Sequence, residues 1–163
     1  MASDTYIKFD AIPGEVTTAD HKEWIEVLSF SHGVSMAINE STVSAGSRSS
    51  GRANVSDFSF VKMMDKASVL LTNNCVTGAT IPTVTVDLTR AGEGKQEVYM
   101  TYTLSGVLVS SISVGAGGDG VPTESVSLAF GKISWKYLPT SGMDGKQATK
   151  VEKTFDMTTL KST

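Results

Sequence analysis

The sequence has few of the residues that crosslink chains, span membranes or bind polyanions. Cys75 is the single cysteine, so no disulfide can form within the chain and the fold is not expected to need an oxidising compartment. No stretch approaches the roughly 18 uninterrupted apolar residues that span a bilayer, so we expect no membrane insertion. The 14 basic and 17 acidic residues are mixed along the chain, so we expect no nucleic-acid partner either.

The residues that build metal centres and nucleophilic active sites are also scarce. His21 and His32 are the two histidines, and neither has a second histidine or a cysteine at metal-ligand spacing. No Gly-x-Ser-x-Gly elbow presents a nucleophile. The glycine-rich run 115–120 leads into a proline and a strand rather than a helix, which favours a hairpin loop over a phosphate site. We therefore expect no catalytic residue, no metal site and no cofactor.

The length of the chain bounds its organisation. Its 163 residues suit a single domain, residues 1–163, which can bury a core but cannot enclose a wide cavity of its own. Any large lumen would need several copies of the chain. Residues 1–10 lack the basic and apolar regions of a secretory signal peptide, so we expect the protein to be cytoplasmic when it is made.

Alternation of apolar and polar side chains dominates the sequence. In residues 83–89 and 98–104 the apolar side chains occupy every second position, as in a strand with one buried face. Further strands are expected at these places: 6–9, 24–30, 53–60, 107–114, 126–137 and 151–157. The fold class is therefore mainly β, an antiparallel β-barrel or a two-sheet sandwich of about seven or eight strands.

Two glycines interrupt the alternation. After Gly106 the apolar positions no longer keep to one face, which indicates a bend or a bulge. Around Gly131 the apolar side chains change from even to odd positions, and a period of two cannot produce that change without an inserted residue. We expect a bulge at Gly131, where one long strand passes from one sheet to the other.

One packed helix and one long projecting loop complete the predicted architecture. The helix is expected over residues 66–75, with Asp65 as its cap and Gly78 after its end. Its apolar stripe is Ala67, Leu70, Leu71 and Cys75. The loop covers about residues 38–50, which are mostly small and polar, and we expect it to form a shallow, mainly polar contact.

Five stretches of the sequence carry a family resemblance, and together they cover nearly its full length. They are residues 21–30, 51–68, 78–82, 107–112 and 122–137. Through them the chain resembles the Hcp family, the haemolysin-coregulated proteins that stack as rings into the tube of the bacterial type VI secretion system. The residues that this resemblance marks as structural are Trp24, Gly51, Arg52, Asp57, Phe58, Phe60, Asp65, Lys66, Gly131 and Trp135.

The resemblance implies a structural protein and not an enzyme. It implies a homohexameric ring that stacks into a tube, is secreted through the type VI machinery without a signal peptide, and carries effectors in its lumen. The implied partners are further copies of the chain, the spike protein, the sheath and effector proteins.

Two groups of residues are candidates for these contacts. In the resembling family the strand that contains Ser29 and Ser31 faces the lumen, and His32 stands where many members carry an aromatic residue. We expect these three residues to contact effectors. The candidates for ring stacking lie in the long loop: Thr42, Val43, Ser44, Ser47, Arg48 and Ser49.

Three other functions remain open at this point. A carbohydrate-binding or adhesin-like β-sandwich would expose its aromatic residues for sugar stacking. A phage-like tail-tube subunit would share the architecture of the first prediction. A hydrolase could use a histidine, or paired carboxylates such as Asp57 and Asp65, but Asp57 is more simply explained as an ion-pair partner of Arg52 or Lys62.

Overall fold

Twelve β-strands, one α-helix and one short 3-10 helix form the part of the chain that the computed structural model describes, residues 3–40, 48–92, 94–139 and 149–163. For residues 39, 40 and 48–50 the description covers the backbone alone. The first elements are β1 (Thr5–Phe9), η1 (Ala19–His21), β2 (Ile25–Val27), β3 (Ser29–Ser31), β4 (Val34–Glu40), β5 (Arg48–Val55), β6 (Phe58–Met63) and α1 (Ala67–Thr77). They are followed by β7 (Ile81–Ala91), β8 (Gln96–Gly115), β9 (Thr123–Ala129), β10 (Lys132–Tyr137), β11 (Val151–Asp156) and β12 (Lys161–Ser162).

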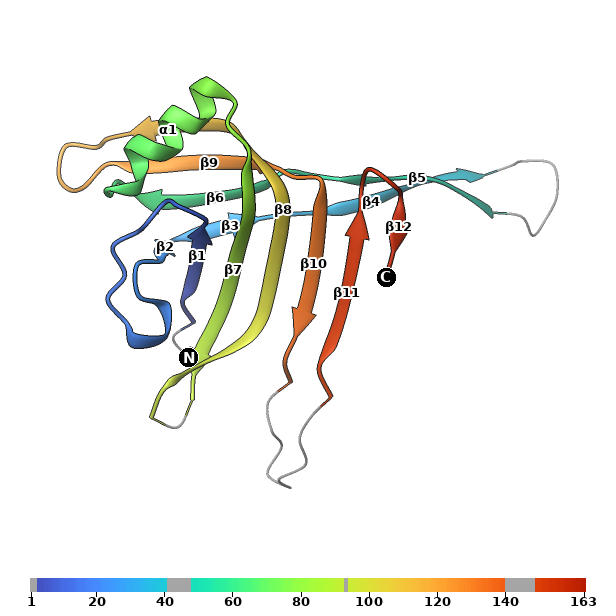
Figure 1. Cartoon of the computed structure of the whole chain (residues 1–163), viewed down its shortest axis with the longest axis horizontal. Helices are drawn as coiled ribbons and strands as arrows, with labels where there is room; N and C mark the ends of the chain where they lie inside the picture. The colour runs from blue at the N-terminus through green and yellow to red at the C-terminus, as the bar shows by residue number, and fades with distance from the viewer. Residues whose placement is uncertain (1–2, 41–47, 93, 140–148) are drawn as a thin grey trace.

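Ten of these strands form one antiparallel sheet that folds back into two layers. The first layer has the order β12-β11-β10-β8-β7-β1-β2, and the second contains β3, β6, β9 and the C-terminal part of β8. In Figure 1 the strands of the second layer run across those of the first. The structure confirms the predicted mainly β fold with one packed helix. The layers form a two-sheet sandwich, and the described strands do not close into a barrel.

The two glycines that interrupt the alternation lie where the chain passes between the layers. Strand β8 pairs with β10 as far as Ser105 and with β9 from Leu108, and Gly106 between them has a φ of 61°. Glycine adopts this left-handed backbone without a Cβ clash. Gly131 separates β9 in the second layer from β10 in the first, and its N–H donates to the Ser105 carbonyl oxygen at 3.0 Å. The interrupted alternation therefore marked both corners of the sandwich.

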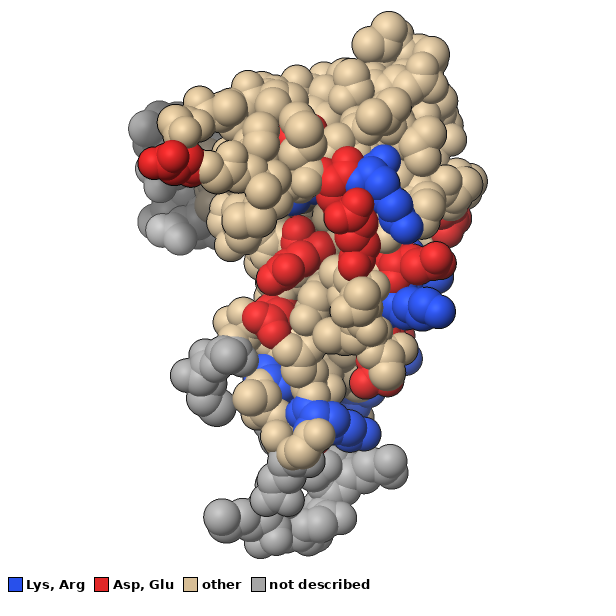
Figure 2. All heavy atoms as spheres, turned by 90° about the vertical axis from the view of Figure 1, so that its left-hand side faces the viewer, with Lys and Arg blue, Asp and Glu red and all other residues tan. Residues whose placement is uncertain are grey.

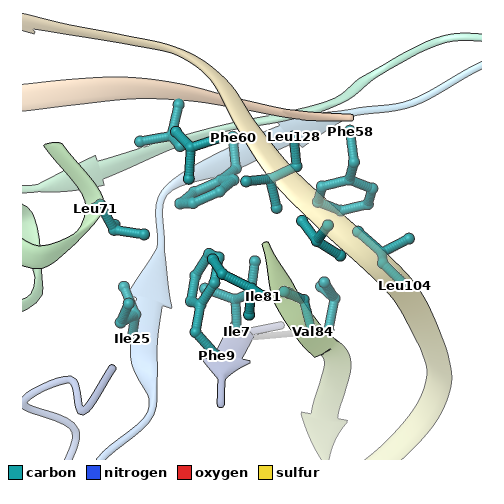
Figure 3. Packing of buried hydrophobic residues seen from close by; sticks show 14 of the residues in the cluster. Ile7, Phe9, Ile25, Phe58, Phe60, Leu71, Ile81, Val84, Leu104 and Leu128 are labelled. Carbon is teal, nitrogen blue, oxygen red and sulfur yellow. The ribbon is translucent and has the colours of Figure 1, made fainter. Parts of the chain in front are cut away.

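The hydrophobic core lies between the two layers and beside the helix. Figure 3 shows side chains of both layers meeting there: Ile7, Phe9, Ile81 and Val84 on one side, and Phe58, Phe60 and Leu128 on the other. Phe58 and Phe60 are almost completely buried, while Trp135 packs against this cluster and is partly buried. Burial of a side chain of this size contributes about 1.5–3 kcal/mol.

Helix α1 begins one residue later and ends two residues later than the sequence indicates. The Asp65 Oδ1 atom accepts a hydrogen bond from the Ala67 N–H at 3.0 Å, and Ser68 Oγ accepts one from the Asp65 N–H at 3.0 Å. At the other end Gly78 has a φ of 68° and donates to the Asn74 carbonyl oxygen at 3.0 Å. Asp65 and Gly78, the residues that the sequence indicates at the two ends of the helix, thus both make hydrogen bonds there.

The predicted apolar stripe of the helix is correct at three of its four positions. Ala67 and Leu71 are buried and Cys75 is partly buried against the core. Leu70 is 40% exposed, so its assignment to the buried stripe is wrong. Ser68 is buried instead, because its hydroxyl has polar partners beneath the helix.

Three strands that the alternation predicts as continuous are each divided. One of them is 126–137, which becomes β9 and β10 on either side of Gly131. The predicted strand 24–30 becomes β2 and β3, because the Leu28 N–H between them donates to the Val61 carbonyl oxygen of the second layer at 2.8 Å. The predicted strand 53–60 becomes β5 and β6. These breaks account for part of the excess of strands over the predicted number.

Strands β4 and β5 leave the sandwich and form a projecting two-stranded hairpin, which we call the arm (Figure 1). Residues 38–40 and 48–50 of the predicted loop are strand, and residues 41–47 lie outside the described part of the chain. A bulge lies between Met36 and Ile38, opposite Gly51. A Cβ atom on Gly51 would lie 2.8 Å from the Ala37 carbonyl oxygen, so this position requires glycine.

Candidate functional site

The two serines predicted to contact effectors lie on strand β3. Ser29 and Ser31 are both exposed, and Phe30 between them points to the opposite side, where its ring stacks on Phe58 at 5.5 Å between centroids. Strand geometry explains this arrangement, because successive side chains point to opposite faces. The structure therefore places both serines on the outer surface of the second layer.

Neighbouring strands extend this surface into a larger array of hydroxyl groups. Side chains of directly paired residues lie on the same face of a sheet. Ser31 pairs with Ser59, Ser59 with Ser127, and Ser127 with Ser111. In the adjacent row Val61 lies between Ser29 and Ser125, and Ser125 pairs with Ser113. We call the following residues the serine face: Ser29, Ser31, Ser59, Ser111, Ser113, Ser125 and Ser127.

The serine face carries hydroxyl groups and no charged side chain among these paired positions. Ser59 and Ser127 are hydrogen-bonded through their Oγ atoms at 2.9 Å. A hydroxyl both donates and accepts, so this surface can bind polar groups of either kind without a preference for one charge. The sequence contained the signal, because Ser-apolar-Ser alternation also occurs at residues 111–113 and 125–127.

His32 does not lie on the serine face. Its ring packs among aromatic side chains, with centroids 5.9 Å from Phe58, 6.2 Å from Tyr102 and 5.9 Å from Phe130. Both ring nitrogens are buried, and no described residue forms a hydrogen bond of good geometry with them. The structure thus separates His32 from Ser29 and Ser31, so the prediction that all three share one surface is wrong for His32.

Burial lowers the pKa of His32 below its ordinary value of 6.5, and the nearby Ser56 backbone opposes this only in part. Tyr102, the titratable side chain in contact with the His32 ring, has a pKa that burial raises further, so it stays neutral around neutral pH. A histidine with a depressed pKa binds fewer protons in the folded state than in the unfolded state. Its contribution to stability is therefore complete above pH 6.5 and is lost as the pH falls through the folded-state pKa.

Replacing His32 with phenylalanine is expected to remove this acid-sensitive part of the stability. The variant keeps an aromatic ring in the cluster but has no group to protonate. Urea unfolding between about pH 7 and pH 5 measures the effect, and the curve of the variant should be flatter than that of the parent protein. If the stability of both proteins depends on pH in the same way, His32 is not the source of the acid sensitivity.

A buried ion cluster ties helix α1 to the second layer. The Lys62 Nζ atom lies 2.7 Å from Asp65 Oδ1 and 2.9 Å from Glu124 Oε2, and Lys62 and Glu124 are buried. Ser68 Oγ donates to Glu124 Oε2 at 2.6 Å. Because every charged group has a partner, the cluster is structural, and the Asp65 carboxylate is not free for acid-base chemistry.

The predicted ion pair of Asp57 with Arg52 or Lys62 is wrong. Asp57 Oδ2 accepts a hydrogen bond from Ser110 Oγ at 2.7 Å, and Lys62 belongs to the buried cluster. Arg52 is exposed. Lys66 is exposed as well, and its backbone N–H donates to Glu15 Oε1 at 3.1 Å at the start of α1.

His21 is held in a second buried polar contact. Its Nε2 atom lies 3.0 Å from Asp87 Oδ2, and Thr101 Oγ1 donates to Asp87 Oδ1 at 2.7 Å. The ring stacks on Tyr6 at 4.6 Å and meets the edge of Trp24 at 4.7 Å. No serine hydroxyl bonds to either histidine in the described chain, so the hydrolase alternative gains no support.

Among the aromatic residues that the structure describes, Tyr137 alone is exposed, at 44%, so no group of exposed rings forms a sugar-stacking surface. Phe58 and Phe60 are core residues, and Trp135 is partly buried. Across the residues that the structure describes there is no cluster of three potential metal ligands. The same residues include no helix of the length and apolarity that crossing a bilayer requires.

The arm exposes apolar side chains near its base. Val34, Met36 and Ile38 on β4 are between 47% and 60% exposed. Ile38 alone of these three belongs to the loop predicted at 38–50, and Val34 and Met36 precede it. Of the stacking candidates, Arg48 and Ser49 lie in β5, paired with Glu40 and Asn39. The others, Thr42, Val43, Ser44 and Ser47, lie outside the described residues.

Comparison with known proteins assigns the family. The family model described as "Type VI secretion system effector, Hcp" matches residues 6–137. Protein hcp1 of Pseudomonas aeruginosa is 35% identical over 153 residues, which are 93% of each chain. A solved structure described as a type six secretion system protein has a TM-score of 0.89 at 32% identity, covering 99% of this chain and all of the other.

A second solved structure, Hcp1 from Salmonella typhimurium, has a TM-score of 0.79 at 28% identity over the full length of both chains. The family model matches more than half of the chain, and the similarity to solved structures extends over its whole length. Both agree with the resemblance that the five sequence stretches indicated. The chain therefore belongs to the Hcp family and is a type VI secretion system tube protein, a structural protein and not an enzyme.

Proposed function

We propose that the protein forms hexameric rings that stack into the inner tube of the type VI secretion system and shield effectors in the lumen. The tube is secreted through the machinery that contains it, and its partners are further copies of the chain, the spike protein, the sheath and effectors. A single chain of this size cannot enclose such a lumen, so the function requires assembly. Unpaired strand edges support this assembly, because the open backbone groups of an edge strand pair with other chains.

The serine face is the observation that carries the proposed lumen. It is a mainly polar surface built from four strand segments of one layer, and Ser29 and Ser31 belong to it. An uncharged wall of hydroxyl groups can contact a folded cargo through hydrogen bonds that are individually modest, each contributing about 0.5–1.5 kcal/mol. Such contacts suit cargo that must be held during transport and then released.

The arm is the proposed contact between stacked rings. It projects from the sandwich, and its base presents exposed Val34, Met36 and Ile38. Side chains of this kind gain free energy when a second ring covers them, at about 25 cal/mol per Å² of apolar area. The stacking candidates Arg48 and Ser49 lie toward the distal end of the same hairpin.

Replacing residues 42–49 with a tight turn is expected to weaken stacking while the ring stays intact. The change removes the end of the arm and leaves all strands of the sandwich unchanged. Shortening a surface loop changes the closure entropy only slowly, by about 0.6 kcal/mol for each halving of its length. Negative-stain electron microscopy should show single rings in place of tubes, and the melting temperature should stay close to that of the parent protein.

Two results would contradict the assignment of residues 42–49 to a stacking arm that lies outside the core. If the shortened protein does not fold, the segment belongs to the core. If tubes of normal length form, the arm does not hold stacked rings together. A parent protein that forms no rings at high concentration would refute the proposed assembly itself.

A further inference from the structure

One flank of the first layer is acidic. The segment from Lys8 to Leu28, which we call the acidic flank, carries β2 at the edge of the sheet and the connection that precedes it. Its exposed charged residues are Asp10, Glu15, Asp20, Glu23 and Glu26, with Lys8 and Lys22 as the opposing charges. Figure 2 views the molecule from this side and shows acidic side chains gathered across the middle of the surface. The flank has a net negative charge.

The surface at the opposite end of the first layer, where β10, β11 and β12 lie, is basic. Strands β10, β11 and β12, together with residues 149 and 150, form what we call the basic flank. Its lysines are Lys132, Lys136, Lys150, Lys153 and Lys161, and its acids are Glu152 and Asp156. The excess of lysines over acids equals the excess of acids over lysines on the acidic flank. Two surfaces of opposite charge thus lie at opposite ends of one sheet.

Most of these charges have no partner within the described chain. Lys150 lies 2.6 Å from Glu152, and Lys132 lies 4.0 Å from Asp156. Lys153 and Lys161 make no ion pair with any described residue, and neither do the acids of the acidic flank. Like charges that gather on one surface repel each other, so both flanks gain free energy when an oppositely charged surface approaches.

Exposed apolar side chains accompany the charges on both flanks. A groove of about 310 Å³ borders the acidic flank. It is lined by Glu15, Glu26 and exposed Leu28 of the flank and by exposed Met63 at the end of β6. On the basic flank the exposed apolar residues are Tyr137 and Val151, and exposed Leu160 lies beside them in the connection between β11 and β12. Protein interfaces commonly combine an apolar centre with a polar rim, and each flank contains both parts.

The backbone of β11 adds a third observation. Phe155 and Asp156 pair with β12, and Thr154 exchanges hydrogen bonds with Thr163. Residues 151–153 pair with β10 on one side and with no described residue on the other. This open edge lies within the basic flank, where an approaching chain could also use its backbone groups.

We propose that the acidic flank of one copy binds the basic flank of the next copy and that this contact closes the ring. The inference rests on the proposed ring assembly and adds which two surfaces meet. Two different surfaces that bind each other give a heterologous contact, and repeated rotation about one axis closes it. A second copy is the fitting partner, because each chain carries both complementary surfaces at opposite ends of one sheet.

Charge reversal on each flank tests the proposal. The acidic-flank variant combines Asp20→Lys with Glu26→Lys, and the basic-flank variant combines Lys153→Glu with Lys161→Glu. All four side chains are exposed and make no hydrogen bond or ion pair with described residues, so both variants should fold. The control is Asp119→Lys, an exposed acid in the connection between β8 and β9.

Each reversed variant alone should remain a 17.2 kDa species in sedimentation or light scattering, because every contact would then join like charges. An equimolar mixture of the two variants should assemble, since each flank then meets one of opposite charge when the two alternate around the ring. The Asp119→Lys control should assemble like the parent protein. Circular dichroism should show the same strand content in all of them.

The outcomes separate this inference from the proposed function. If the parent protein forms rings and both reversed variants form them equally well, the flanks are not the contact, while the ring assembly stands. If the variants stay apart and their mixture does not assemble either, charge complementarity between these flanks is refuted. If the parent protein forms no rings, the proposed function fails before the flanks are tested.

Discussion

Replacing Lys62 with methionine is expected to lower the free energy of unfolding by about 3–5 kcal/mol, because the buried Glu124 carboxylate loses its ion-pair partner. Lys62 is 0% exposed and Glu124 is 1% exposed, so water cannot replace the lost charge. Urea unfolding measures the change. In a domain of this size the melting temperature should fall by roughly 10 °C, since each kcal/mol moves it by about 2–4 °C.

Two further variants separate a buried charge from simple loss of packing. Combining Lys62→Met with Glu124→Leu should recover most of the lost stability, because replacing both partners of a buried pair by apolar groups is often neutral. Lys132→Met is the matched surface control, since Lys132 is half exposed and 4.0 Å from its partner, and its effect should stay within about 0.5 kcal/mol. A loss below about 1 kcal/mol for Lys62→Met would show that the cluster is dispensable.

Replacing Gly14 with alanine is expected to cost about 3 kcal/mol, because the added methyl group meets backbone that cannot move away. A Cβ atom at this position would lie 2.2 Å from the Trp24 carbonyl oxygen and 2.7 Å from Ile25 Cγ1. The Trp24 carbonyl oxygen accepts a hydrogen bond from the Val16 N–H at 3.0 Å. The Gly14 N–H donates to the Glu23 carbonyl oxygen at 2.7 Å. The substitution therefore displaces the segment that carries the acidic flank, and thermal unfolding should show it.

Gly115→Ala is the control for this prediction. Nothing lies within 4 Å of a Cβ atom at Gly115, at the end of β8, so the change should stay within about 1 kcal/mol of the parent protein. An equal loss in both variants would mean that the methyl group acts on the chain in general. A loss for Gly14→Ala alone supports the close approach of the two backbone segments.

Short-range signals in the sequence predicted much of the fold. The alternation located the strands, because the side-chain period of a strand is a property of its own backbone. The changes of phase at Gly106 and Gly131 located both corners between the layers. Asp65 and Gly78 indicated the ends of the helix, because capping involves residues close in sequence.

The candidate site was predicted only in part, because its members come from distant strands. Alternation around Phe30 identified Ser29 and Ser31, but Ser59 and Ser127 join them only through the pairing of β3, β6 and β9. His32 was grouped with the serines by its position in the sequence. In the structure its ring turns into the aromatic cluster, as expected for a residue two positions after Phe30 on an alternating strand.

By itself the sequence determined the fold class, the family and the approximate place of each strand, corner and helix end, since these depend on local periodicity and backbone preference. The tertiary structure alone decided which distant residues meet. Lys62 and Glu124 are far apart in the sequence and share a buried ion pair, and the acidic and basic flanks become opposite edges of one sheet. Strand register and layer packing set these contacts, and both depend on long-range burial that a local pattern does not contain.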